Sequence, residues 1–267
     1  MTRDLEYNIT AQDNGVTISD YLKKQGFSHA VTVQLKKIPE SILLNGKWEY
    51  MSTRLNDGDC LFIHFEETEG SENIVATNLP LSICYEDEDI LVVNKPADMP
   101  IHPSMNNYDN TLANAVCHYY QTQGIPYTFR CVNRLDRDTT GLLVIAKHLL
   151  AGCILSDQML HRQIHRQYRA IVCGKTEKEG IIDAPIGRAE DSTVLRRIDF
   201  EHGETARTHY KLLSYDEEKD LSYIHEEIRR MTPFPESQDF LHISKMPKHN
   251  ITIGAALPYI KEFLGIK

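Results

Sequence analysis

The segment 133–147, NRLDRDTTGLLVIAK, combines side chains that could carry out chemistry. Its Asp136 offers a carboxylate, which can serve as a nucleophile or as a charge that stabilises a reaction intermediate. Its Arg134 offers a planar guanidinium, which can both stack on a flat ring and bind phosphate. The competing interpretations are a helix cap or loop residue for Asp136, and an arginine that only pairs with Asp136 or Asp138 for Arg134.

Two further positions are candidates for supporting this segment. Tyr168 presents an aromatic face with a hydroxyl, which suits stacking and proton handling. In a strand it would share one face with Ala170 and Val172, so a core tyrosine is the competing interpretation. Thr140 can hold the loop by hydrogen bonds just before Gly141, which permits a tight turn into a strand, and its predicted role is structural.

The sequence predicts neither a metal site nor a nucleotide cofactor. His161 and His165 are spaced i, i+4, but no third ligand of suitable spacing accompanies them, and a solvated or phosphate-facing helix end fits them better. The chain has no GxGxxG and no GxxxxGK pattern. Its six cysteines are scattered without a CxxC pair, which is typical of reduced thiols in a cytosolic protein.

The segment 133–147 resembles the central motif of the RluA/RluD-type pseudouridine synthases, which is normally HRLD followed by T, T or S, G and an apolar strand ending in AK. Residues 94–104, NKPADMPIHPS, are similar to the family's NKPAGMPVHPS loop. The stretches RQYRAIVCG (166–174), GIIDAPIGR (180–188) and ARTHYKLL (206–213) are similar to those that follow. The resemblance covers the chain from about Leu81 to Ser214.

This resemblance implies isomerisation of uridine to pseudouridine in a structured RNA, rRNA or tRNA. The reaction breaks a C–N glycosidic bond and rejoins the same uracil through carbon, without redox change, so no cofactor and no metal are expected. By resemblance Asp136 is the catalytic carboxylate, Arg134 occupies the gap left by the flipped nucleotide, and Tyr168 packs against the uracil ring. Thr140 and Lys95 are further candidates for contacting RNA, and Lys95 could instead brace its loop.

The sequence departs from the family at two places. Asn133 stands where histidine is usual, which keeps hydrogen-bonding capacity but removes a titratable ring. After the strand at 210–213, members normally have TGRTHQIRVH, which supplies an arginine that pairs with the catalytic aspartate. Here residues 221–231 read LSYIHEEIRRM, so Arg229 is the remaining candidate for that partner. A carboxylate without its cationic partner has a different pKa and orientation.

Two rival functions follow from these departures and from the acidic motif itself. The first is a catalytically impaired RNA-binding protein on the same scaffold, favoured by the altered segment after residue 220. The second is an aspartate-dependent hydrolase of small glycosides. It is disfavoured because such enzymes normally use two acidic residues, whereas the surroundings of Asp136 are basic.

The elements that must position these residues follow from periodicity and breakers. The fold class predicted is α+β, with a mixed, mainly antiparallel sheet and flanking helices, because strands occur in series with helices inserted irregularly. Helices are predicted at 17–25, 28–37, 111–121 and 149–162, and strands at 42–48 (with an Asn45-Gly46 turn), 57–65, 83–86, 90–94, 142–146, 168–172 and 207–214. The apolar segment 253–266 is predicted to form a closing helix or strand.

Three regions are predicted along the chain. Residues 1–65 resemble a small S4-type RNA-binding module, although few basic residues remain on its helices, and a capping domain without RNA contact is the alternative. Residues 66–80 are acidic and weakly periodic, as in a linker. Residues 81–267 form the predicted catalytic domain, divergent from about residue 221.

Charge and hydropathy limit the partners. The net charge of −9 excludes a uniformly basic nucleic-acid binder. Basic residues nevertheless crowd into the central stretch, where a charge-segregated surface can steer a polyanion: Arg130, Arg134, Arg137, Lys147, Arg162, Arg166 and Arg169. No signal peptide and no membrane span are predicted, so a cytoplasmic monomer with RNA as its partner is expected.

Overall fold

The structure is a computed structural model that describes residues 1–71, 73–161, 163–164, 166–189 and 196–229. The chain forms two compact units. The first consists of residues 1–95, 100–133 and 141–161, and the second of residues 96–99, 134–140 and the described residues from 163 onward. Both units are built from antiparallel strands, so the predicted α+β class with a mainly antiparallel sheet is confirmed.

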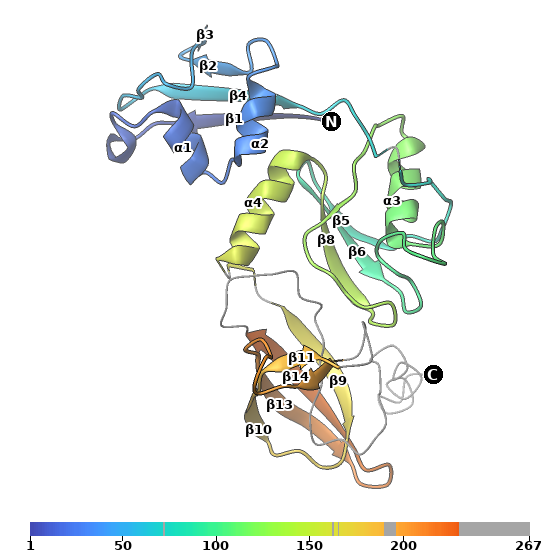
Figure 1. The fold of residues 1–267 in the computed structure, drawn as a ribbon. Coiled ribbons are helices and arrows are strands. Elements are labelled where there is room, and N and C mark those ends of the chain that lie inside the picture. Colours follow the sequence, from blue (N-terminus) through green and yellow to red (C-terminus); the bar gives the residue numbers. More distant parts are fainter. Residues whose placement is uncertain (72, 162, 165, 190–195, 230–267) are drawn as a thin grey trace. The chain divides into compact units, whose positions relative to one another are not determined.

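The first unit begins with a four-stranded antiparallel sheet and two short helices (Figure 1). The strand order is β1-β4-β2-β3, with β1 at Thr2–Asn8, β2 at Ile42–Leu44, β3 at Lys47–Trp48 and β4 at Cys60–Glu66. A 3-10 turn at Ala11–Asp13, α1 at Ile18–Lys24 and α2 at His29–Leu35 lie between β1 and β2. Asn45 and Gly46 both have positive φ, as a two-residue hairpin turn requires, which confirms the predicted Asn-Gly turn.

Both helices begin where an N-cap residue stands in the sequence. The Thr17 side chain accepts a hydrogen bond from the Asp20 backbone N–H, and the Ser28 side chain accepts one from that of Val31. Each bond satisfies a backbone donor that has no partner within the helix. The predicted helices therefore start at the expected places, although each ends one or two residues earlier than predicted.

One apolar core closes this N-terminal sheet and its helices, and it extends beyond residue 66. Its buried members include Ile18 and Leu22 from α1 and Phe65 from β4. Leu150 from α4, at Leu149–Leu160, is buried in the same core, and Ile154 packs against it. The sheet is therefore covered partly by a helix that lies more than 80 residues later in the chain. The predicted division into an S4-like module, a linker and a catalytic domain stays a prediction.

The second sheet of the first unit carries the strand on which the motif at 133–147 ends. Its order is β5-β6-β8-β7, all antiparallel, with β5 at Ile83–Glu86, β6 at Ile90–Lys95, β7 at Arg130–Cys131 and β8 at Gly141–Ala146. The helix α3, at Leu112–Gln121, starts with a capping box. In it, Thr111 and Asn114 each accept a hydrogen bond from the backbone N–H of the other.

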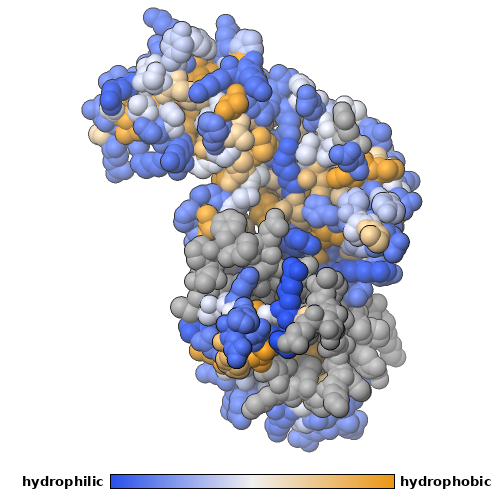
Figure 2. Space-filling view, viewed as in Figure 1, coloured by the Kyte–Doolittle hydropathy of each residue, from blue (hydrophilic) through white to orange (hydrophobic). Residues whose placement is uncertain are grey.

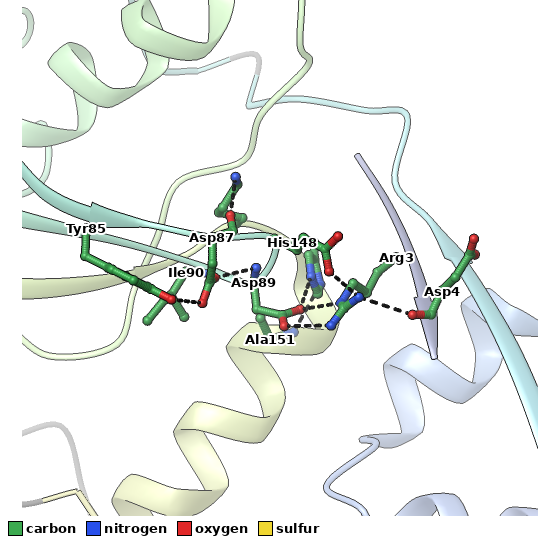
Figure 3. Close-up of polar contacts among 10 residues, drawn as sticks. Arg3, Asp4, Tyr85, Asp87, Asp89, Ile90, His148 and Ala151 are labelled. Atoms are coloured by element: carbon green, nitrogen blue, oxygen red, sulfur yellow. Dashed lines mark hydrogen bonds and ion pairs between the residues drawn. The ribbon is translucent and has the colours of Figure 1, made fainter. Parts of the chain in front are cut away.

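Polar contacts join the N-terminal strand to the second sheet and to α4 (Figure 3). The guanidinium of Arg3 donates to the Asp89 carboxylate at 2.9 Å, and His148 Nε2 lies 3.0 Å from the same carboxylate. His148 also caps α4, because its Nδ1 accepts from the Ala151 N–H at 3.2 Å. Burial lowers the pKa of His148, although Asp89 opposes this effect. The ring is therefore kept neutral, as the cap requires.

The second unit is organised around a third antiparallel sheet, of order β10-β13-β14-β9 (Figure 1). Its strands are β9 at Gln167–Cys173, β10 at Glu179–Asp183, β13 at Arg207–Asp216 and β14 at Leu221–Arg229; β11 at Ile186–Arg188 pairs with β12 at Arg196–Ile198. The sequence predicted β9 and most of β13 but missed β10, β11, β12 and β14. The predicted closing element at 253–266 lies outside the described residues.

Hydrophilic residues cover most of the described surface seen in Figure 2, with apolar residues in smaller areas between them. Within the described parts of the chain, no helix is long and apolar enough to cross a membrane.

Candidate active site

The loop that carries Asp136 runs from the end of β7 to the start of β8, and hydrogen bonds to β8 hold its first residues. At its start, the Val144 N–H donates to the side-chain oxygen of Asn133 at 3.0 Å, and the Val132 N–H donates to the Val144 carbonyl at 2.9 Å. At its end, Gly141 has a φ of +132°, which an L-residue rarely adopts. Asn133, which stands where the resembled motif has histidine, thus anchors the start of the loop through its amide.

Within the loop, residues 134–140 differ in burial. Leu135 and Thr139 are buried, Asp136 is half-buried, and Arg134 is exposed. The Thr139 N–H donates to the Asp136 backbone carbonyl at 3.1 Å, which closes a turn that begins at Asp136. The loop is therefore held by its apolar and turn residues, while its charged residues keep access to solvent.

A second segment, residues 96–99, is attached to this loop within the same unit. Arg137 Nε donates to Asp98 Oδ1 at 2.6 Å, and the Met99 N–H donates to the Arg137 carbonyl at 3.2 Å. Asp98 has a φ of +58°, where the resembled NKPAGMPVHPS loop has glycine. Aspartate tolerates this left-handed conformation better than most residues. Asp98 thus keeps the turn that glycine would make and adds an ion pair with Arg137.

Tyr168 lies near the start of β9 and is half-buried. It shares one face of the strand with Ala170 and Val172, as predicted, and both of these belong to the core of the second unit. In the pairing of β9 with β14, Tyr168 stands directly opposite Glu226. The tyrosine therefore lies at the end of the row of apolar side chains formed by Ala170 and Val172 on this face of β9.

Glu226 is a polar residue of this region that the sequence analysis did not single out. Its side chain is 0% exposed, and neither carboxylate oxygen has a hydrogen-bond partner among the described residues. Burial raises its pKa to about 8. The alternation in LSYIHEEIR, which aligns Glu226 with Ser222 and Ile224, is the signal that would have found it.

The structure divides the predicted site residues between the two units. Arg134, Asp136, Thr140, Tyr168 and the backbone of Arg229 all belong to the second unit. Arg229 ends β14, where it pairs with Arg207, and its side chain lies outside the described residues.

Lys95 belongs to the first unit, at the end of β6, and its side chain is 0% exposed. A fully buried ammonium is not available to phosphate, so this burial favours the bracing role over RNA contact.

Among the residues with described side chains, no group of three or more His, Cys, Asp or Glu could hold a metal ion. The expected lack of metal and cofactor stays a prediction.

Comparison with known proteins places this arrangement in a family. The family model described as "RNA pseudouridylate synthase" matches residues 89–231, which contain all six predicted site residues. The chain belongs to the RNA pseudouridylate synthase family. Members of this family form pseudouridine in RNA, and RNA is therefore the substrate class of this chain. The predicted RluA/RluD-type resemblance is confirmed at the level of the family.

Several relatives of this synthase are known. An uncharacterized RNA pseudouridine synthase of Bacillus subtilis, YjbO, is 36% identical over 196 residues, which are 73% of this chain and 69% of that one. Ribosomal large subunit pseudouridine synthase D of Nitrosomonas europaea is 40% identical over 157 residues, 58% of this chain and 45% of that one. Among solved structures, human RNA pseudouridylate synthase domain containing 1 has a TM-score of 0.47 and 25% identity, covering 56% and 59% of the two chains.

Proposed function

We propose that this pseudouridine synthase isomerises uridine in ribosomal RNA with Asp136 as its essential carboxylate. The observation that carries the proposal is the position of Asp136. It is half-buried at a turn, in a loop whose neighbouring Arg134 is exposed, inside the range matched by the family. The ribosomal target is supported by the relatives of Nitrosomonas europaea and Escherichia coli, which are large-subunit synthases by name. Transfer RNA is the alternative substrate.

The chemistry assigns a separate task to each residue. The N1–C1′ bond of the target uridine breaks, and the uracil leaves with the bonding electrons. Asp136 captures or stabilises the electron-poor partner left behind. A C5–C1′ bond then forms, C5 loses its proton and N1 gains one. Atoms and electrons therefore balance within one nucleotide, and no oxidant or reductant is consumed.

Access and orientation of the uridine are assigned to Arg134 and Tyr168. A uridine stacked in RNA cannot reach a carboxylate, so it must be flipped out. The exposed guanidinium of Arg134 is suited to fill the gap in the stack and to bind phosphate. The half-buried ring of Tyr168 is suited to pack against the extruded uracil.

Release of tritium from RNA labelled at uracil C5 tests the role of Asp136, because the reaction expels the C5 proton. Unmodified bacterial large-subunit rRNA and tRNA are the substrates. Asp136→Asn is expected to lower the rate by at least about a thousandfold, as removal of an essential nucleophile does. Asp138→Asn is the matched control: it removes the same charge two residues away and is expected to stay within about tenfold of the wild type.

Equal loss in both variants would assign the effect to the fold of the loop rather than to the Asp136 carboxylate. Release from tRNA but not from rRNA would overturn the ribosomal target and leave the isomerisation intact.

The alternative function is RNA binding without turnover. The specific observation in its favour is the sequence after residue 220, which lacks the TGRTHQIRVH segment of the resembled family. Tight binding of rRNA by the wild type, with no tritium release and with no change in Asp136→Asn, would establish this alternative.

A further inference from the structure

Glu226 interrupts the apolar face of the sheet in the second unit. Along β14, Ser222, Ile224 and Glu226 share one face, and Ile224 belongs to the core formed with Ala170 and Val172. Glu226 continues this stripe but carries a carboxyl group that is fully buried and has no hydrogen-bond partner among the described residues. Such burial of an unpaired polar group costs stability. Because its burial lowers the stability of the fold, the Glu226 carboxyl is a candidate for a functional role.

The neighbours of Glu226 connect it to the proposed uridine site. On the strands either side of β14, it stands directly opposite Tyr168 of β9 and Tyr210 of β13. Residues opposed in this way have Cβ atoms about 4.5–5.5 Å apart and interact through their side chains. The ring of Tyr210 covers Gly180 of β10, where an added Cβ would lie 2.6 Å from the tyrosine hydroxyl. Tyr168 is therefore the neighbour through which Glu226 can act on a bound base.

The state of the Glu226 carboxyl follows from its surroundings. The titratable side chains directly opposite it are the two tyrosines, and its same-face neighbour on β14, Ile224, is apolar. Burial raises the pKa of Glu226 to about 8, and no charged group among the described side chains contributes to this shift. A pKa near 8 leaves the carboxyl mostly protonated at neutral pH, because burial disfavours the ionised form.

The absence of charge on the Glu226 carboxyl matters for the proposed reaction. When the N1–C1′ bond breaks, the departing uracil carries the electron pair and develops negative charge. A carboxylate buried beside the tyrosine that packs on this base would repel that charge, and the repulsion would be strong because the surroundings are apolar. A protonated carboxyl has the same shape without this repulsion.

We propose that Glu226 is a positioning residue that acts through Tyr168. Its buried carboxyl places no negative charge beside the tyrosine or beside the uracil that packs on it. This inference rests on the proposed function. Glu226 does not replace Asp136, which stays the residue that meets the reacting sugar or base.

The pH dependence of single-turnover tritium release tests this inference. Between pH 7 and pH 9, the wild type is expected to lose about tenfold in rate, because a group with a pKa near 8 passes from mostly protonated to mostly ionised. Glu226→Gln keeps the shape but cannot ionise, so its rate is expected to lack this loss. Glu226→Met, which is also uncharged and similar in size, is expected to behave like the glutamine variant.

Glu218→Gln is the matched control, because it makes the same replacement at an exposed turn of the same unit. It is expected to keep the alkaline loss of the wild type. Thermal unfolding monitored by circular dichroism identifies variants that have lost their fold.

The outcomes separate the two proposals. If the wild type is active and both folded Glu226 variants lose rate between pH 7 and pH 9 as it does, the role of Glu226 is refuted and the isomerisation stands. If the wild type releases no tritium at any pH, the proposed function is refuted, and the role of Glu226 with it.

Discussion

The N-terminal sheet and the sheet of the second unit use their buried positions differently. Around β1 to β4, the buried core is a large set of apolar side chains drawn from both helices, the sheet and α4. In the second unit, the described core consists of Ala170, Val172 and Ile224, with two half-buried residues against it, and it ends at the buried Glu226. The first region buries a large apolar core, which stabilises the fold. The second region has a small core, with a carboxyl group and a tyrosine at its edge.

Matched isoleucines in the two cores give the largest expected difference. Ile18 and Ile224 are both fully buried. Ile18→Ala is expected to cost about 4 kcal/mol, whereas Ile224→Ala is expected to cost about 2 kcal/mol, because a small core collapses more easily around the space left by the deleted atoms. Chemical denaturation of the full chain, followed by hydrogen exchange in each sheet, measures both costs. Equal losses would remove the contrast between the two cores.

The pH dependence of stability sharpens the comparison at Glu226. Its pKa is raised to about 8 in the folded chain, above the ordinary value of 4.5. The folded state therefore holds a proton that the unfolded state has released, so stability falls as the pH rises from about 4.5 to about 8. Wild type is expected to lose on the order of 4 kcal/mol more than Glu226→Gln over this range. Urea titrations at pH 5 and pH 8 measure this, and parallel pH dependences would show that the carboxyl is ionised in the fold.

The smallest expected effect is at the capping box of α3, where the first unit satisfies its buried polar groups. Thr111 and Asn114 are both buried and bonded to each other's backbone. Thr111→Ala is expected to cost about 1 kcal/mol, because a backbone donor at the helix start loses its partner. Thr122→Ala, at the exposed end of the same helix, is the control and is expected to cost less than about 0.5 kcal/mol. Urea midpoints measure both, and equal costs would show that the box adds nothing.

Local chemistry made the helices and turns predictable. Thr17, Ser28 and Thr111 are residue types that cap helices, and Asn45-Gly46 is the pair that a two-residue hairpin turn prefers. The cap of α4 was not predictable, because His148 acts as an acceptor only when burial keeps its ring neutral. The helix itself was predicted at 149–162, so the local pattern identified the element but not the group that caps it.

The surroundings of the site were less accessible from sequence, because they depend on burial set by distant strands. The motif at 133–147 identified Asp136, Arg134 and the strand that follows, through a resemblance rather than through periodicity. Glu226 lies in a polar stretch that reads as solvent-exposed, and Lys95 lies in a segment that reads as a surface loop. Both are buried because of the strands that pair beside them.

The packing of α4 against the N-terminal core has a consequence for biosynthesis. The first sheet and its two helices leave the ribosome early, but Leu150 and Ile154 complete their core and are made more than 80 residues after β4. Gly26, at the end of α1, approaches Ile154 so closely that an added Cβ would lie 3.1 Å from its Cγ1. Until α4 has been translated, the nascent N-terminal segment exposes an apolar surface, and chaperones have their best opportunity to bind it then.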